Sequence, residues 1–290
     1  MTVAELLTEA ARELTERGVA APEWDAERLL RHVLGWERAA LVASPGAPVA
    51  GDPERAFRAL VAERARRVPL QHLVGSQAFW KHEFKVTREV LIPRPETELL
   101  VETALELLRV AEHPVVVDVG TGSGCIALSF AAERREAEVH ATDVSAPALE
   151  VARDNARLLG LEGRVAFHLG QLLEPVAGLA GRIDLVVSNP PYVDPSERET
   201  LAPEVRDHEP GLALFPPGDA LSIYRRLLPE AFERLRPGGW LIVEIAPALA
   251  GAVAGLFAGA GFEELRVAND LAGRARLVRG RRPMRELQLG

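Results

Sequence analysis

The sequence predicts an α/β fold in which a seven-stranded, mostly parallel sheet carries helices on both faces and follows a small helical domain. Two observations lead to this prediction. From residue 115 onward, short apolar runs alternate with segments of helical periodicity, as in sheets built from strand–helix–strand units. Before residue 75, only helical periodicity is present. A chain of 290 residues that is 48% apolar can bury two separate cores.

The first predicted elements are helices. Thr2 and Glu5 fit a capping box, and the apolar residues after them recur at helical spacing until Gly18 can end the helix. A second helix is expected after Pro22 and a third from Asp52. A short basic run near the end of the third helix consists of Arg64, Arg66 and Arg67. We interpret it as a solvated helix face rather than as a contact for an acidic partner.

A change of pattern predicts the domain boundaries. Residues 75–93 are rich in aromatic and β-branched side chains, so we expect a β-hairpin linker there. It would join a helical domain at 1–74 to a sheet domain at 94–290. In the sheet domain, a proline-rich stretch comes first, and a helix then runs to about residue 108.

The alternation after this helix predicts the elements of the sheet domain. Strands are expected at 115–119, 138–142, 164–168, 183–188, 239–245, 262–267 and 275–279. Helices are expected at 124–135, 146–160, 171–180, 220–236 and 248–260. Only a short link, Ala268 to Arg274, joins the last two strands. A link that short favours an antiparallel pair at the sheet edge.

Composition excludes several classes of protein. The 34 basic and 42 acidic residues give a net charge of −8, and residues 1–74 hold 10 Arg against 11 Asp and Glu. This balance argues against a nucleic-acid partner. Cys125 is the only cysteine, so a disulfide within the chain is excluded, and the histidines do not cluster, so we expect no metal. Neither a signal peptide nor an apolar run of membrane length occurs, so we expect a soluble, cytoplasmic protein.

A glycine-rich turn follows the first predicted strand of the sheet. The turn consists of Gly120, Thr121, Gly122, Ser123 and Gly124. Glycines there allow a tight turn and let a ligand approach the backbone at the carboxyl end of the sheet. Asp118 on the strand end suits an ammonium group better than phosphates, and no P-loop lysine follows. The alternative is a tight turn without a ligand.

A second acidic residue, Asp143, ends the next predicted strand, 25 residues after Asp118. An acid at this position can accept hydrogen bonds from both hydroxyls of a ribose. The alternative is that Asp143 caps the following helix, a role that Ser145 could equally supply.

The fourth predicted strand runs into Asn189, Pro190, Pro191 and Tyr192. Two prolines stiffen the backbone and remove two donors, which leaves carbonyl oxygens free to accept hydrogen bonds. Asn189 adds an amide oxygen, and Tyr192 adds a face on which a flat group can stack. We therefore predict a binding site for a planar NH2 group, with Asn189, Pro190 and Tyr192 as catalytic candidates. The alternative is an ordinary Pro-Pro loop.

Together these motifs resemble the class I methyltransferases that act on nitrogen, which have a Rossmann-like sheet. The stretch Val90-Leu-Ile-Pro-Arg-Pro-Glu-Thr-Glu98 narrows the resemblance to the release factor glutamine methyltransferases, the PrmC or HemK family. Further similar stretches are Glu204 with His208-Glu209-Pro210, 218–227 and 270–274, so the resemblance covers almost the whole chain.

The resemblance implies a function and roles for these residues. The enzyme would transfer a methyl group from S-adenosylmethionine, releasing S-adenosylhomocysteine, to N5 of the glutamine in the Gly-Gly-Gln loop of class I release factors. The 120–124 turn would hold the methionine part of the cofactor and Asp143 its ribose. Asn189 would face both cofactor and substrate, and Asn189 to Tyr192 would bind the glutamine. The helical domain would help to dock the release factor, and a monomer is expected.

One position departs from the family pattern near the adenine. Where the family often has Gly-Asp, this chain has Gly170, Gln171 and Leu172, so the adenine would be recognised by Gln171, by the backbone or by packing on Leu172. His208 lies in one of the stretches that resemble the family, and it is a candidate to line the substrate cleft.

Residue chemistry leaves one rival substrate open. An N6-adenine methyltransferase acting on DNA or RNA needs the same acceptors for an NH2 group, although the acidic charge argues against it. A nicotinamide-dependent oxidoreductase is less consistent with the sequence, since the dinucleotide fingerprint is missing.

Overall fold

The structure, a computed structural model, describes residues 1–284. It contains two compact units. The first comprises Met1–Ser76 and the later segment Leu201–His208, and the second comprises Gln77–Thr200 and the chain from Glu209 onward. The units differ from the predicted domains at two places. The hairpin falls almost entirely within the second unit, and a segment from the middle of the sheet domain belongs to the first.

The first unit is a small helical bundle. Its helices are α1 Val3–Glu16, α2 Pro22–Leu34, α3 Arg38–Ala43, α4 Asp52–Ala65 and α5 Leu70–Val74. The predicted capping box is confirmed, since the Thr2 hydroxyl accepts from the Glu5 amide and the Glu5 carboxylate accepts from the Thr2 amide. The core contains Leu6, Leu29 and Phe57, all fully buried.

A buried ion cluster holds Leu201–His208 against this bundle, and it corrects the interpretation of the basic run as a solvated face. Arg64 is 6% exposed and donates to Asp25 at 2.7 Å and to Glu204 at 2.9 Å. Arg67 donates two further bonds of 2.7 Å to Glu204. A pattern of charges on a helix cannot show that an acid 140 residues away pairs with it. Only Arg66, paired with Glu63, is on an exposed face.

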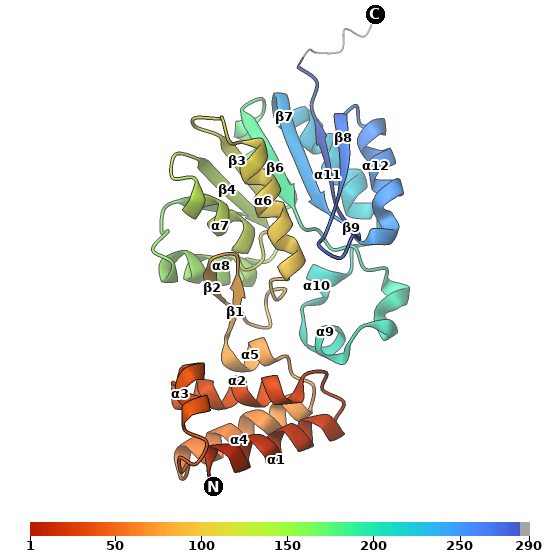
Figure 1. The fold of residues 1–290 in the computed structure, drawn as a ribbon. Coiled ribbons are helices and arrows are strands. Elements are labelled where there is room, and N and C mark those ends of the chain that lie inside the picture. Colours follow the sequence, from red (N-terminus) through yellow and green to blue (C-terminus); the bar gives the residue numbers. More distant parts are fainter. Residues whose placement is uncertain (285–290) are drawn as a thin grey trace, which may run out of the picture. The chain divides into compact units, whose positions relative to one another are not determined.

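The second unit contains a seven-stranded sheet in the order β5-β4-β3-β6-β7-β9-β8 (Figure 1). The strands are β3 Val115–Val119, β4 Glu138–Asp143, β5 Val165–Leu169, β6 Ile183–Ser188, β7 Leu235–Glu244, β8 Glu263–Asn269 and β9 Ala275–Arg281. Pairs among β3 to β7 are parallel, whereas β9 runs antiparallel to β7 and β8. The predicted mostly parallel sheet and its antiparallel edge pair are therefore confirmed.

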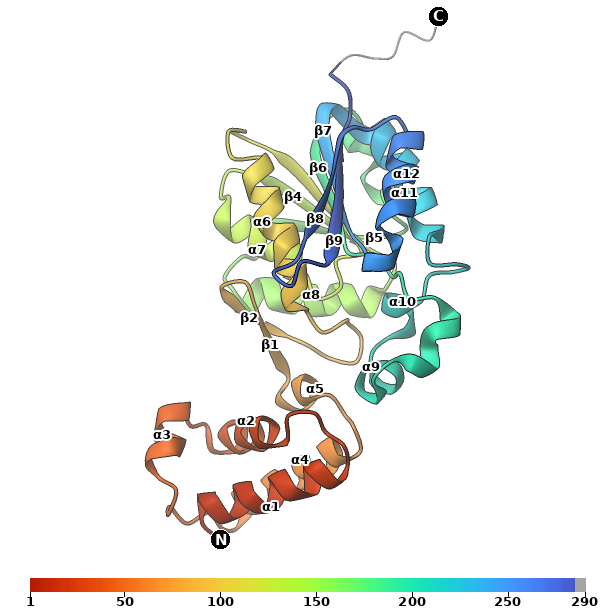
Figure 2. The same ribbon diagram turned by 45° about the vertical axis from the view of Figure 1, so that its right-hand side comes forward.

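Helices cover both faces of this sheet, as Figure 2 shows from its edge. On one face lie α6 Glu98–Leu107, α7 Cys125–Glu133 and α8 Ala146–Leu158, and on the other lie α11 Ser222–Arg234 and α12 Ala250–Gly259. Consecutive β3 residues point to opposite faces, so Val116 joins the first core while Val117 joins the second. Both faces of the strand are therefore buried, and four of its five residues are valine, the exception being Asp118.

The remaining elements are short. They are β1 Ser76–Phe79, β2 His82–Lys85, α9 Pro203–His208, α10 Gly211–Leu214 and the 3₁₀ turns Pro95–Thr97, Glu174–Leu179, Pro195–Thr200 and Pro247–Leu249. The predicted hairpin is confirmed by β1 and β2. The helix predicted at 171–180 was wrong, because the segment forms 3₁₀ turns around Val176, whose φ and ψ are not helical.

Strand order determines where ligands can bind. From β3 the chain proceeds through β4 to β5 at one edge and then returns to place β6 on the other side of β3. Open α/β sheets bind ligands at such a reversal, beyond the carboxyl ends of the strands. Here the reversal brings together the ends of β3, β4 and β6, which carry the predicted motifs.

Candidate active site

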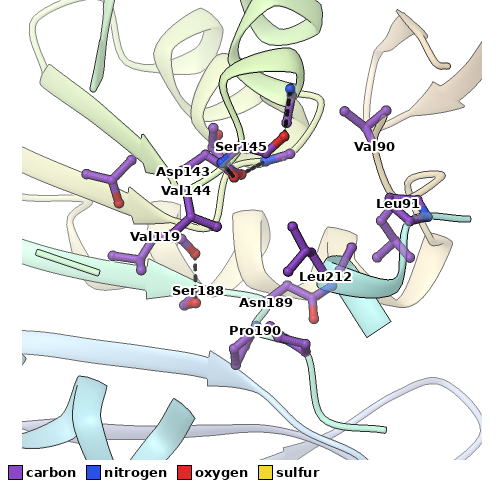
Figure 3. Close-up of a pocket in the computed structure, with 18 of the residues that line it drawn as sticks. Val90, Leu91, Val119, Asp143, Val144, Ser145, Ser188, Asn189, Pro190 and Leu212 are labelled. Atoms are coloured by element: carbon purple, nitrogen blue, oxygen red, sulfur yellow. Dashed lines mark hydrogen bonds between the residues drawn. The ribbon is translucent and has the colours of Figure 1, made fainter. Parts of the chain in front are cut away.

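A cavity of about 450 Å³ lies at the carboxyl ends of β3, β4 and β6, within the second unit. Its size is that of a small-molecule site. Figure 3 shows Asp143 at the end of one strand and Asn189 and Pro190 beyond the end of another, with Val90 and Leu91 on a facing loop. The strand order therefore brings the predicted motifs to one cavity.

The glycine turn is built so that its backbone faces the cavity. Gly120, Gly122 and Gly124 all have positive φ, between 55° and 81°, which side chains disfavour. The amides of Gly120 and Thr121 both donate to the Thr142 carbonyl, so the turn is tied to β4. Gly120 to Ser123 line the cavity. Gly124 does not, and a Cβ added to it would lie against Leu128 and Ala152 of the helices behind the turn.

Asp143 lies at the cavity wall and is only 9% exposed. Its two oxygens accept from the amides of Gly122 and Ser145, each at 2.9 Å. Burial raises its pKa, and these two amide bonds oppose the rise. The cap of α8 is Ser145, whose hydroxyl accepts from the Ala148 amide, so Asp143 is not needed as the cap. Each carboxylate oxygen keeps a lone pair for a ligand hydroxyl.

Asp118 is fully buried and is not among the residues that line the cavity. One oxygen accepts from the Thr121 hydroxyl at 2.7 Å and from the Ala127 amide at 3.2 Å. Within residues 1–284, the other oxygen has no hydrogen-bond partner. Burial raises the pKa of this carboxyl to about 7. In the structure, Asp118 holds the glycine turn to α7, and its contact with a ligand ammonium stays a prediction.

Gln171 and Leu172 line the far side of the cavity. The Gln171 amide oxygen accepts from Arg226 at 2.6 Å. Leu172 has a φ of +45°, and its carbonyl accepts from the Thr142 hydroxyl at 2.7 Å. The structure thus brings both predicted adenine-contact residues to the cavity and adds Arg226, which the sequence analysis missed.

The predicted NH2 site lies at the opposite end of the cavity. Asn189, Pro190 and Pro191 line it, directly after β6. The strand end is held to β3 because the Ser188 hydroxyl donates to the Val119 carbonyl at 2.8 Å. The Asn189 amide nitrogen donates to the Thr97 hydroxyl at 3.2 Å.

Tyr192 does not line the cavity. It packs against the core beneath the sheet, and its hydroxyl lies 3.4 Å from the Glu244 carboxylate, to which it donates. Burial raises the pKa of Tyr192 to about 12, so the phenol is neutral. Stacking of its ring on a substrate stays a prediction.

Several residues that shape the cavity were not predicted as site residues from the sequence. Val90, Leu91 and the exposed Leu212 form apolar walls. Glu209, 7% exposed, fixes the loop before α6 by accepting from the Ile92 amide at 3.1 Å and from Arg94. The signal was present, because Val90 to Glu98 and 208–210 are two of the stretches that carry the resemblance to the family. By contrast, His208 belongs to the first unit and does not line the cavity.

Comparison with known proteins assigns the family. Residues 5–75 match the PrmC N-terminal domain and residues 95–205 match the methyltransferase small domain. The release factor glutamine methyltransferase of Deinococcus radiodurans is 46% identical over 97% of this chain and 99% of its own length. This chain belongs to the release factor glutamine methyltransferase family. The member from Cereibacter sphaeroides is 43% identical over 98% of this chain and 99% of its own length.

Solved structures support the fold of this methyltransferase. The catalytic domain of hMettl16, crystallised with a MAT2A 3′UTR hairpin, aligns with a TM-score of 0.59 at 16% identity, covering 79% of this chain and 82% of that one. A methyltransferase from Pyrococcus furiosus aligns at 0.50 and 17% identity, covering 77% and 98%. The predicted Rossmann-like methyltransferase fold is thus confirmed.

The methyltransferase uses S-adenosylmethionine, as predicted from the sequence. Its residues fit that cofactor, because each Asp143 oxygen accepts one hydrogen bond from a backbone amide and keeps an acceptor site, and the cavity is of suitable size. Within residues 1–284, no group of three or more His, Cys, Asp or Glu side chains could hold a metal ion. The helices of that same stretch are all too short or too polar to span a membrane.

Proposed function

We propose that this methyltransferase methylates N5 of the glutamine in the Gly-Gly-Gln loop of class I release factors, and that the loop enters the cavity at Asn189. The observation that carries the proposal is the Asn189 amide, whose nitrogen is engaged by Thr97 at 3.2 Å inside the cavity. Its oxygen is thereby left to accept from an NH2 group. The choice of substrate is supported by the similar proteins from Deinococcus radiodurans and Cereibacter sphaeroides, both named release factor glutamine methyltransferases.

The cofactor would lie along the ends of β3 and β4. Gly120 to Ser123 would hold its methionine part, Asp143 its ribose hydroxyls, and Gln171 with Leu172 its adenine. When bound, the cofactor supplies an activated methyl group on a sulfonium. The protein's task is then to bring the acceptor nitrogen into line with that methyl group.

Asn189 and Pro190 would perform this alignment. An amide nitrogen is a poor nucleophile because its lone pair is delocalised into the carbonyl. The Asn189 side-chain oxygen and the Pro190 carbonyl would accept from the two N–H groups and orient the nitrogen. Positive charge grows on that nitrogen during transfer, so both acceptors interact more strongly in the transition state than before it. A strong base is not required beforehand, since the proton becomes acidic only after transfer.

The partner and setting follow from this substrate. We propose that the first unit, which matches the PrmC N-terminal domain, helps to dock the release factor. We propose further that the enzyme acts as a monomer in the cytoplasm, where release factors meet the ribosome. The rival substrate is an adenine amine in DNA or RNA. The neutral first 74 residues and the net charge of −8 oppose it, since nucleic-acid enzymes need basic surfaces.

Mass spectrometry tests the substrate. The enzyme and S-adenosylmethionine are incubated with a full-length class I release factor and, as matched control, with the same factor carrying alanine for the loop glutamine. We expect one methyl group on the loop glutamine of the first and none on the second. Methylation of DNA or RNA together with an unmodified release factor would overturn the proposal.

A further inference from the structure

We propose that Thr97 and Glu244 are positioning residues that set which way the Asn189 amide faces, so that its oxygen and not its NH2 group meets the substrate. The proposal rests on the function proposed above and adds two residues to it. Both residues are almost fully buried, Thr97 at 2% and Glu244 at 1% exposure. Thr97 precedes α6 and Glu244 ends β7, so neither belongs to the loop that contains Asn189.

The direction of two hydrogen bonds carries the inference. Thr97 donates its hydroxyl hydrogen to Glu244 at 2.7 Å, and the same hydroxyl oxygen accepts from the Asn189 amide nitrogen at 3.2 Å. An ionised carboxylate can only accept, and a hydroxyl has one hydrogen to give. Once Thr97 has given that hydrogen to Glu244, it can only accept from Asn189. The amide must therefore turn its NH2 group to Thr97 and its oxygen away.

The opposite orientation would defeat the proposed chemistry. An Asn189 NH2 group facing the glutamine NH2 group would set donor against donor and remove an acceptor from the growing positive charge. The two orientations of an amide have nearly the same shape. Packing alone therefore distinguishes poorly between the two orientations of the Asn189 amide. The Thr97 hydroxyl distinguishes them directly, because it can only accept a hydrogen bond from the NH2 group.

The surroundings keep Glu244 in place as an acceptor. Its other oxygen accepts from Tyr192 at 3.4 Å, and its main-chain carbonyl accepts from the Tyr224 hydroxyl at 2.7 Å. The charged group facing it from β9 is Arg276, which favours the carboxylate, while Glu96 from the turn before α6 disfavours it. Cys125 of α7 also faces the Glu244 carboxylate. The pKa of Cys125 is raised to about 12, chiefly by burial, so this thiol stays neutral.

The ionisation of Glu244 gives the arrangement a pH dependence. Burial raises the pKa of Glu244 to about 7, against the opposing effects of Thr97 and Arg276. Below that pH the protonated carboxyl can donate to Thr97, and Thr97 can then donate to Asn189. The selection is lost, so we expect kcat to fall as pH decreases through about 7.

The first experiment compares Thr97→Val with Thr97→Ser in single-turnover methylation of the release factor. Valine has nearly the same shape without the hydroxyl, and we expect kcat to fall by roughly 10-fold to 100-fold, as for the loss of one oriented hydrogen bond to a charged network. Serine restores the hydroxyl and most of kcat. KM for the release factor and calorimetric affinity for S-adenosylmethionine should stay within about twofold in both.

The second experiment measures kcat against pH for Glu244→Gln. The glutamine amide can either accept from Thr97 or donate to it, so kcat should be below wild type at every pH. Because this amide does not titrate, the acid limb should disappear. An unchanged acid limb in this variant would overturn the role of Glu244. Full kcat in Thr97→Val, with wild-type melting temperature, would overturn the role of Thr97.

The wild-type enzyme separates this inference from the proposed function. If it leaves the release factor unmethylated, the proposed function fails. If it methylates the loop glutamine while Thr97→Val is as active as wild type, the function stands and only the positioning role fails. A Thr97→Val protein that does not fold leaves the comparison to the pH profile of Glu244→Gln, which alone decides the role of Glu244.

Discussion

The two ends of the cavity are built from different parts of the chain. At the β3–β4 end the lining is mainly backbone, with glycines at positive φ and amides that point to Asp143 or to the Thr142 carbonyl. At the β6 end the lining is side chains, with Asn189 held by Thr97 and Thr97 held by Glu244. At the backbone end, replacing a glycine at positive φ introduces steric strain. At the side-chain end, removing one hydrogen-bond donor or acceptor disrupts the network.

This difference separates two kinds of defect. Damage to the backbone end should weaken cofactor binding or folding, because the hydrogen bonds of the turn give this end of the cavity its shape and hold Asp143 in place. Damage to the side-chain end should reduce kcat, because its acceptors act mainly on charge that develops during the transfer. Substitutions at the two ends therefore test whether the division holds.

Asn189→Ala should have the largest effect. It removes the proposed acceptor, and we expect kcat to fall by roughly 10²–10³, as when one positioned polar group is deleted. Single-turnover methylation of a release factor measures this. Cofactor affinity, measured by calorimetry, should stay within about twofold. Near-normal turnover would remove Asn189 from the mechanism.

Asp143→Asn should affect the binding of S-adenosylmethionine rather than kcat. Loss of the carboxylate should weaken S-adenosylmethionine binding by about 10-fold to 100-fold, since hydrogen bonds to a charged group contribute about 1.5–3 kcal/mol. Ser145→Ala is the matched control, because it removes the α8 cap and costs about 1 kcal/mol of stability. We expect it to lower the melting temperature and leave affinity unchanged, and the reverse result would contradict the ribose role of Asp143.

Two alanine substitutions in the glycine turn should separate an effect on stability from an effect on cofactor binding. They are Gly124→Ala and Gly122→Ala. Both positions have positive φ, which costs an alanine about 1–2 kcal/mol. At Gly124 the added Cβ would also lie 3.0 Å from Leu128 and 3.2 Å from Ala152, whereas at Gly122 it meets nothing within 4 Å and faces the cavity. Gly124→Ala should therefore lower the melting temperature more, and Gly122→Ala should weaken cofactor binding more. Equal effects on both measurements would refute this separation.

Tyr192→Phe should have the smallest effect. It removes only a 3.4 Å hydrogen bond to Glu244 and keeps the ring, so we expect kcat to change by less than about threefold. Tyr192→Leu decides whether the ring stacks on the substrate. A large kcat loss in a leucine variant with a wild-type melting temperature would support stacking, and wild-type kcat would exclude it.

Local patterns were enough to predict which motifs meet at the cavity. The alternation of strands and helices predicts a parallel sheet, and parallel strands end at one edge, so the 120–124 turn, Asp143 and Asn189 had to be neighbours. Side-chain direction was harder. The sequence predicted that Asp118 meets a ligand ammonium group and Asp143 a ribose, but the structure buries Asp118 behind the turn and has only Asp143 at the cavity wall.

The sequence by itself determined the fold class, the order of the turns that line the cavity and the family, because each is encoded by residues close together in the chain. Only the tertiary structure decided which side chains support Asn189. Thr97 lies 92 residues before it and 147 residues before Glu244. The Arg64–Glu204 pair spans 140 residues in the same way. Such pairs leave no periodic trace in the sequence, because they form only when the packing of the whole unit brings distant strand and helix ends within hydrogen-bonding distance.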